Sequence, residues 1–150
     1  MKRFALIATV VAILAACSDG NASLDEKASG AATDFAKAYF NYDFKRALDL
    51  TTPESAKWIS FAASNITQED IDVLNTREKE ASVELTDCRM VNDSTCETLL
   101  TVSNYMATDS IGRPGIIKEE GTFRLKVVNR DGKWKVRMEG LPRSEKHSRD

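Results

Sequence analysis

Cysteine is the most reactive residue type in this 150-residue chain, which has three of them. Cys17 follows an apolar stretch, whereas Cys88 and Cys96 lie on either side of the turn-forming residues 92–94. A cysteine sulfur can be acylated, paired in a disulfide or bound to a metal ion. The single histidine, His147, lies in a polar stretch, which excludes histidine-dependent triads and His-rich metal sites. Because no catalytic motif, zinc-ligand spacing or phosphate-binding glycine loop is present, we expect no catalytic residue, metal or cofactor.

The N-terminal residues have the organisation of a secretory signal. Two of the first three residues are basic, and residues 4–16 are apolar apart from one threonine. Such a run is too short to span a bilayer, which takes about 20 apolar residues. Residues 14–17, Leu-Ala-Ala-Cys, resemble the bacterial lipobox. The resemblance implies removal of residues 1–16, acylation of Cys17 and attachment to a membrane; the alternative is a plain secreted protein with a chance cysteine.

The expected processing divides the chain into an anchor, a domain and a tail. We expect the acylated cysteine and a polar tether at residues 17–26, one domain at 27–141 and a polar tail at 142–150. A domain of this length can bury enough surface to fold without a metal ion. Ser18, in place of aspartate, implies the outer membrane by analogy with sorting in enteric bacteria. The nearby acidic residues resemble surface-export signals of Bacteroidetes lipoproteins, so the final leaflet stays open.

Cys88 and Cys96 are expected to form a disulfide. With Cys17 acylated, they are an even number of thiols in an oxidising compartment. If they are directly opposed, Leu85 faces Leu99 across a loop of residues 91–93. The alternative is two free, buried thiols in an imperfect register. Redox catalysis is disfavoured, because redox-active pairs are usually spaced Cys-x-x-Cys at the start of a helix.

Apolar periodicity predicts helices in the first half of the domain. Residues 28–41 repeat apolar side chains at spacings of three and four, and a shorter segment follows at 44–50. The next helix is predicted to start at Thr52-Pro53, where threonine can cap and proline loses no hydrogen bond, and to end at Asn65. Residues 67–70 open a further short helix. The residues expected to face the core from the third segment are Trp58, Ile59 and Ala62.

The second half of the domain reads as two antiparallel hairpins. Alternation of apolar and polar residues begins near Ala81, and residues 98–106 form a second strand-like run. Residues 121–129 and 133–138 flank Asp-Gly, which is among the strongest hairpin signals. A two-residue turn at Asp131-Gly132 predicts that Val127 faces Val136 and that Lys126 faces Arg137.

Helices followed by a four-stranded meander predict an α+β fold, with the N-terminal helices packed in a curved antiparallel sheet. In this order the chain resembles the nuclear-transport-factor-like, or cystatin-like, cone, particularly small lipoproteins of unknown function from Gram-negative bacteria. Residues 39–44, Tyr-Phe-Asn-Tyr-Asp-Phe, and the segment Ala-Leu-Asp-Leu-Thr-Thr-Pro-Glu-Ser at 47–55 carry the resemblance, which covers about residues 27–140. It supports the fold better than any activity, because one fold hosts many functions.

Enzymes of this cone that resemble ketosteroid isomerase use an aspartate base with a tyrosine or protonated aspartate donor. The matching side chains here form no recognisable motif: Tyr39, Tyr42, Asp43, Asp49 and Tyr105. Structural roles are favoured, with the carboxylates at helix ends and the tyrosine rings packed in the core. A pocket inside the cone would be lined by Tyr39, Tyr42, Trp58, Tyr105 and Trp134.

Charge is distributed unevenly along the chain. Without residues 1–16 the net charge is −4, which excludes nucleic-acid binding through overall basicity. Residues 17–117 carry a net charge of −8, whereas 118–150 carry +4. The predicted register gathers on one outward face a set that we call the basic patch: Arg124, Lys126, Lys133, Lys135 and Arg137. The patch could attract anionic lipid, glycan or an acidic protein, or it could be a solvated strand face.

These patterns together predict a non-catalytic lipoprotein of the cell envelope. Its expected partners are the membrane, through the N-terminal lipid, and either a small apolar ligand or another envelope component. The alternative is an enzyme of the ketosteroid-isomerase-like type with the cone as its active site.

Overall fold

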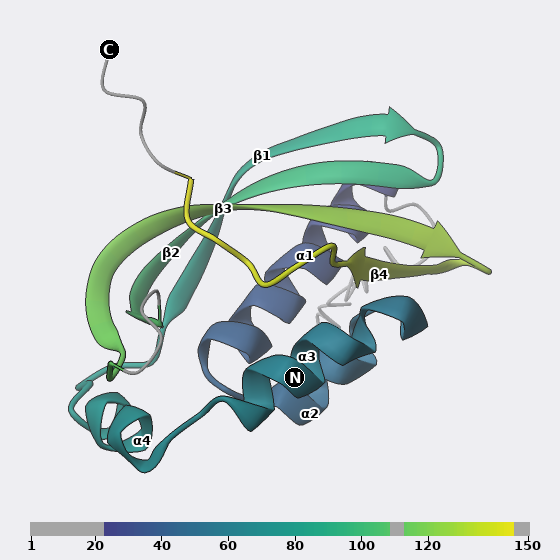
Figure 1. Cartoon of the computed structure of the whole chain (residues 1–150). Coiled ribbons are helices and arrows are strands. Elements are labelled where there is room, and N and C mark those ends of the chain that lie inside the picture. The colour runs from purple at the N-terminus through teal and green to yellow at the C-terminus, as the bar shows by residue number, and fades with distance from the viewer. Residues whose placement is uncertain (1–22, 109–112, 146–150) are drawn as a thin grey trace, which may run out of the picture.

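The computed structural model describes residues 23–108 and 113–145. The helical elements are α1 (Leu24–Phe40), α2 (Phe44–Asp49), the 3-10 turn η1 (Pro53–Ser55), α3 (Ala56–Ser64) and α4 (Gln68–Asn75). The strands are β1 (Ser82–Asn92), β2 (Thr95–Ala107), β3 (Ile116–Arg130) and β4 (Lys133–Arg137). They form one antiparallel sheet in the order β1-β2-β3-β4, which curves around α1 (Figure 1). The predicted α+β fold, with helices packed in a curved four-stranded sheet, is confirmed.

Helix α1 begins one turn earlier than its apolar stripe. Its first buried residue is Ala28, but the helix starts at Leu24, where Asp25 and Glu26 suit the positive end of the helix dipole. Residues 24–26 are therefore helical and do not belong to the tether predicted at 17–26. In the described part of the chain, no helix is long and apolar enough to cross a membrane.

The third predicted helical segment divides into η1 and α3. Pro53 occupies the first position of η1, as expected. The Thr52 hydroxyl caps no backbone amide; it is instead hydrogen-bonded to the Ser55 hydroxyl at 2.7 Å, and both side chains are buried. In α3, Ile59 and Ala62 are buried as predicted, and Trp58 is partly buried against the core.

The β3–β4 hairpin has the predicted register. Val127 pairs with Val136 and Lys126 with Arg137, across a two-residue turn at Asp131 and Gly132. Both turn residues have positive φ, 55° and 81°, the backbone conformation that a tight hairpin turn of this kind requires. Because this register is as predicted, the basic side chains of β3 and β4 lie on a common face.

The predicted register of the β1–β2 hairpin is wrong. Asn92 pairs with Thr95, so the turn is the two residues 93–94 and not residues 91–93. Leu85 therefore faces Leu100 instead of Leu99, and irregularities follow Leu85 and Met90. Cys88 pairs with Thr98 and Cys96 with Met90, so the two cysteines are diagonal neighbours and not directly opposed.

The core lies between α1 and the concave face of the sheet. The ring centroids of Phe40 and Phe123 are 4.6 Å apart, and the Tyr105 ring meets both edge-on at 5.6 and 5.2 Å. A Cβ atom on Gly121 would collide with the Tyr105 ring, so glycine makes room for tyrosine on the neighbouring strand. The largest apolar side chains with no exposed surface are Phe35, Leu100, Val102, Val127 and Val136. The concave face is thus filled by the protein's own side chains.

The chain returns to the sheet after β4. Ser144 forms a β-bridge with Phe123, and the Glu145 amide donates a hydrogen bond to the Thr122 carbonyl at 2.7 Å. Residues 142–145 therefore form an ordered segment against the edge of β3 and do not belong to the polar tail predicted at 142–150. The rest of that predicted tail, with His147, lies outside the described residues, as do Cys17 and the predicted signal.

Candidate functional site

All five residues of the basic patch lie on the outer face of the sheet. Lys126 and Arg137 are paired, Lys135 faces Val128, and Lys133 faces Arg130 at the turn. Arg124 faces Leu99, one pair further along β3 on the same side. Val128 is only 8% exposed although it lies on this outer face. The half-buried Lys126 and Lys135 are consistent with aliphatic stems that cover apolar surface while the charged ends reach solvent.

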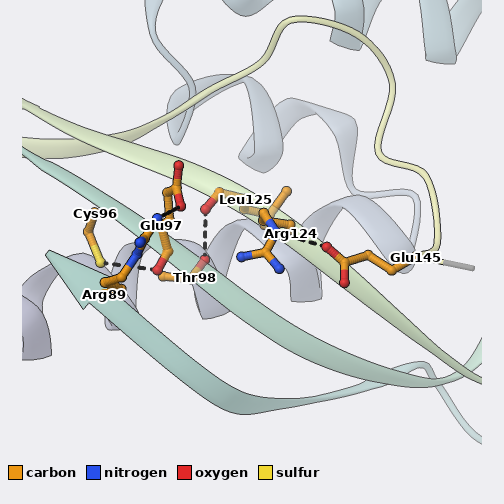
Figure 2. Close-up of polar contacts among 7 residues, drawn as sticks. All are labelled: Arg89, Cys96, Glu97, Thr98, Arg124, Leu125 and Glu145. Atoms are coloured by element: carbon orange, nitrogen blue, oxygen red, sulfur yellow. Dashed lines mark hydrogen bonds and ion pairs between the residues drawn. The ribbon is translucent and has the colours of Figure 1, made fainter. Parts of the chain in front are cut away.

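One row of charged residues crosses all four strands in the middle of this face. In the strand register, Arg89 on β1 lies opposite Glu97 on β2. Glu97 lies opposite Lys126 on β3, and Lys126 lies opposite Arg137 on β4. The Arg89 guanidinium donates to Glu97 at 2.6 Å and lowers the pKa of that carboxyl group (Figure 2). Among the described residues, neither Lys126 nor Arg137 has an ion-pair partner within 4.0 Å. Two cations therefore face each other without a carboxylate between them.

Two depressions lie beside these cations, and both are lined by Arg124, Lys126, Arg137 and Glu139. One, of about 190 Å³, lies between the patch and the segment after β4, and its lining includes Arg124, Lys126, Arg137 and Arg143. The other, of about 290 Å³, is lined by Glu97, Arg124, Lys126, Arg137 and Glu139. Three of the four shared lining residues are basic, which makes this part of the surface suited to an anionic group.

Both arginines of β3 are paired with carboxylates from elsewhere in the chain. Arg124 forms an ion pair with Glu145 at 2.8 Å. Arg130 forms a bidentate ion pair with Glu54 from η1. The hydrogen bonds from Arg130 lower the pKa of Glu54 to about 2. Arg124 and Arg130 are both about half exposed, so these pairs are surface interactions.

Neither of the two depressions is lined by the residues predicted to line a pocket inside the cone. Tyr105 is 5% exposed and packs in the core, and the Tyr39 ring contacts Phe40 and Phe44. The Tyr42 ring also contacts Phe44, with the two ring centroids 5.3 Å apart. Trp58 and Trp134 pack against the core from α3 and β4.

The candidate acid and base residues have structural positions. Asp43 is the N-cap of α2 and accepts a hydrogen bond from the Arg46 amide at 3.2 Å, while Asp49 ends the same helix. Burial raises the pKa of Tyr39 to about 12, and burial also raises the pKa of Tyr42. Both phenols are therefore protonated at neutral pH.

A buried carboxylate that sequence analysis missed joins α4 to the start of β3. Asp70 is 5% exposed and accepts hydrogen bonds from the amides of Thr67, at 3.0 Å, and Gly115, at 2.8 Å. The Thr67 hydroxyl accepts from the Asp70 amide, which completes a capping box. The sequence signal was the threonine three residues before aspartate; the partner at Gly115 is 45 residues away. Both carboxylate oxygens accept hydrogen bonds from backbone amides, so Asp70 has a structural role.

The sulfur atoms of Cys88 and Cys96 are 2.7 Å apart. A disulfide needs about 2.05 Å, so only a small approach of the sulfurs is required. Cys96 is fully buried, and burial raises the pKa of its thiol. Cys88 is less buried and lies 3.7 Å from the Asp25 carbonyl at the start of α1. An oxidant would therefore reach Cys88 first.

We predict that Cys88 and Cys96 are disulfide-linked in protein taken from an oxidising compartment. Peptide mass spectrometry without reduction should recover the two cysteines as one linked pair. Reduction should lower the free energy of unfolding by only about 2 kcal/mol, since a disulfide that closes a short loop stabilises less than one that closes a long loop. Cys88→Ser provides the control, since it should be insensitive to reductant. Two thiols that are freely alkylated after unfolding would contradict the prediction.

Comparisons with known proteins connect the chain to solved structures only. It is similar to an NTF-2 like protein of unknown function from Shewanella oneidensis MR-1, at 12% identity over 71% of this chain and 88% of that chain, with a TM-score of 0.46. It is also similar to an Ntf2-like protein involved in plasmid conjugation, at 14% identity over 83% of this chain and 50% of that chain, with a TM-score of 0.44. A candidate polyketide cyclase from Xanthomonas campestris pv. campestris is 15% identical over 77% of this chain and 93% of that chain, with a TM-score of 0.40. No protein-family model and no curated protein matches the sequence.

Proposed function

We propose that this protein is a lipid-anchored protein of the cell envelope that binds anionic lipid headgroups through the basic patch. The observation that carries the proposal is the direct opposition of Lys126 and Arg137, which have no ion-pair partner among the described residues. Like charges that face each other across two strands are destabilising. A phosphate group between them would remove that repulsion.

The position of the predicted anchor supports a lipid surface as the partner. Six residues separate Cys17 from Leu24, and they reach about 20 Å even when fully extended. The first turn of α1 lies against Cys88, near the end of the sheet that carries both hairpin turns. Figure 1 shows α1 beginning beside this end. An acylated Cys17 would therefore hold the turn end, with Lys133, close to the headgroups.

The packing of the concave face supports a partner on the outer face. Its large apolar residues are buried, and the described depressions around Arg124, Lys126 and Arg137 lie on the opposite side. A small apolar ligand inside the cone would have to displace these core side chains. A binding role on the outer face requires no such rearrangement.

We predict that replacing Lys126, Lys135 and Arg137 with glutamine weakens binding to anionic vesicles at least tenfold at low salt, because each basic group near such a surface contributes about 1 kcal/mol. Binding is measured by vesicle sedimentation with the chain from Ser18 onward, which retains every described residue. Vesicles of phosphatidylglycerol in phosphatidylcholine are compared with pure phosphatidylcholine. Moderate salt should weaken wild-type binding, since exposed charges are screened over about 8–10 Å.

The matched control removes three exposed lysines outside the sheet: Lys37, Lys45 and Lys79. It changes the net charge equally and should weaken binding much less. If the two triple variants bind equally well, the patch is only a solvated strand face and the proposal fails.

A further inference from the structure

The ordered segment after β4 brings an internal carboxylate to the basic patch. Residues 139–143 line the 190 Å³ depression, and Ser144 and Glu145 contact the edge of β3. Two contacts hold these two residues: the bridge to Phe123 and the hydrogen bond to the Thr122 carbonyl. The Glu145 side chain is thereby placed against Arg124 (Figure 2).

The Glu145 carboxylate binds Arg124, one of the basic residues that line the two depressions, although Glu145 itself lines neither of them. Its oxygen lies 2.8 Å from Arg124 Nε, and Arg124 lines both depressions together with Lys126 and Arg137. A guanidinium binds carboxylate and phosphate through the same pair of donors, so the two groups compete for it. The side chains of Arg124 and Glu145 are 52% and 41% exposed. An ion pair with this much exposure to solvent is weak, so another anion can replace the carboxylate.

We infer that the depression beside β3 and β4 is a site for one phosphate group of a lipid headgroup, and that Glu145 is its internal competitor. The inference depends on the proposed function, since it assigns the site and its regulation to the same patch. In the ligand-free protein Glu145 neutralises Arg124. When a phosphate approaches, Arg124 exchanges the carboxylate for the phosphate, to which Lys126 and Arg137 add two further positive charges. The segment after β4 thereby lowers the affinity for surfaces with little anionic lipid.

The test compares two glutamates that each pair with an arginine of β3. Glu145→Gln frees Arg124 inside the site, whereas Glu54→Gln frees Arg130 outside both depressions. The two variants have the same net charge, and the glutamates are similarly exposed, at 41% and 44%. We expect Glu145→Gln to tighten binding to phosphatidylglycerol vesicles threefold or more, and Glu54→Gln, which frees Arg130 opposite Lys133, to tighten it by a clearly smaller factor.

Arg124→Gln provides the second comparison. It should weaken vesicle binding, and in that background Glu145→Gln should have no further effect, because the competition acts through Arg124. Glycerol phosphate, added as a free competitor, separates the two sources of phosphate: displacement only above millimolar concentration indicates a membrane headgroup, whereas displacement at micromolar concentration overturns the assignment to lipid. Equal effects of Glu145→Gln and Glu54→Gln overturn the competitor role alone. Undiminished binding by the Lys126, Lys135 and Arg137 variant overturns the proposed function itself.

Discussion

Asp70→Ala is expected to lower the free energy of unfolding by about 3 kcal/mol, because it removes two hydrogen bonds from amides to a buried carboxylate. The amides belong to Thr67, at the start of α4, and to Gly115, just before β3. The Gly115 amide is in a buried environment and would lose its partner. Urea denaturation followed by circular dichroism measures the effect. A loss this large is a substantial part of the 5–15 kcal/mol that holds an ordinary domain folded.

The matched control is Asp43→Ala, at the exposed N-cap of α2. Asp43 accepts one hydrogen bond, from the Arg46 amide, and its removal should cost about 1 kcal/mol, as is usual for an N-cap. Equal losses for the two variants would show that the buried position of Asp70 adds nothing. Such a result would contradict the role assigned to the contact with Gly115.

The contribution of Asp70 should also depend on pH. Burial by itself raises the pKa of Asp70, but the hydrogen bonds from Thr67 and Gly115 outweigh burial and leave the pKa below its usual value. A lowered pKa in the folded state means that the stabilisation is complete above the unfolded pKa of about 4 and is lost as the pH falls through the lower, folded value. The difference in stability between wild type and Asp70→Asn should therefore be constant from pH 7 to about pH 5 and should narrow below about pH 4.

Cys17→Ser is expected to move the protein from the membrane fraction to the soluble fraction almost completely, or to leave it unprocessed. The expectation follows from the Leu-Ala-Ala-Cys motif after a charged start and a short apolar run. Fractionation of cells followed by intact-mass analysis tests it, and wild type should show the mass of the chain from residue 17 onward plus acyl groups. Cys88→Ser is the control for loss of a thiol and should stay in the membrane fraction. Unchanged fractionation of Cys17→Ser, with an unprocessed wild-type mass, would contradict lipid anchoring.

The sequence predicts the β3–β4 hairpin correctly because the turn residues and the apolar pattern of the strands indicate the same register. Asp131-Gly132 allows positive φ at both turn residues, and the resulting register places Val127 opposite Val136 on the buried face. The opposition of Lys126 and Arg137 followed from the same register. The main feature of the candidate site therefore follows from the sequence alone.

The β1–β2 hairpin shows where local signals are insufficient. Residues 92–94 are all turn-forming, so the sequence does not distinguish a two-residue turn from a three-residue turn. The irregularities after Leu85 and Met90 each insert one residue into β1, and the register with β2 shifts at each of them. Cys88 and Cys96 remain neighbours only because diagonal positions on one face are also close.

The contacts that sequence analysis missed join residues far apart in the chain. The Glu54–Arg130 pair spans 76 residues and the Asp70–Gly115 bond spans 45. Glu145 was predicted to lie in a polar tail because residues 142–145 have no periodic pattern, and only the edge of β3 gives them a place. Partners of this kind are set by the three-dimensional arrangement of the elements, which no local pattern encodes.

Lysine footprinting on vesicles tests most directly whether the outer face of the sheet is the binding surface. The chain from Ser18 onward is acetylated briefly with and without phosphatidylglycerol vesicles, and the modification of each lysine is quantified by mass spectrometry. Lys126, Lys133 and Lys135 are expected to lose most of their reactivity on anionic vesicles and none on phosphatidylcholine, while Lys37, Lys45 and Lys79 keep theirs. Protection of Lys37, Lys45 and Lys79 with continued reactivity of the three patch lysines would contradict it.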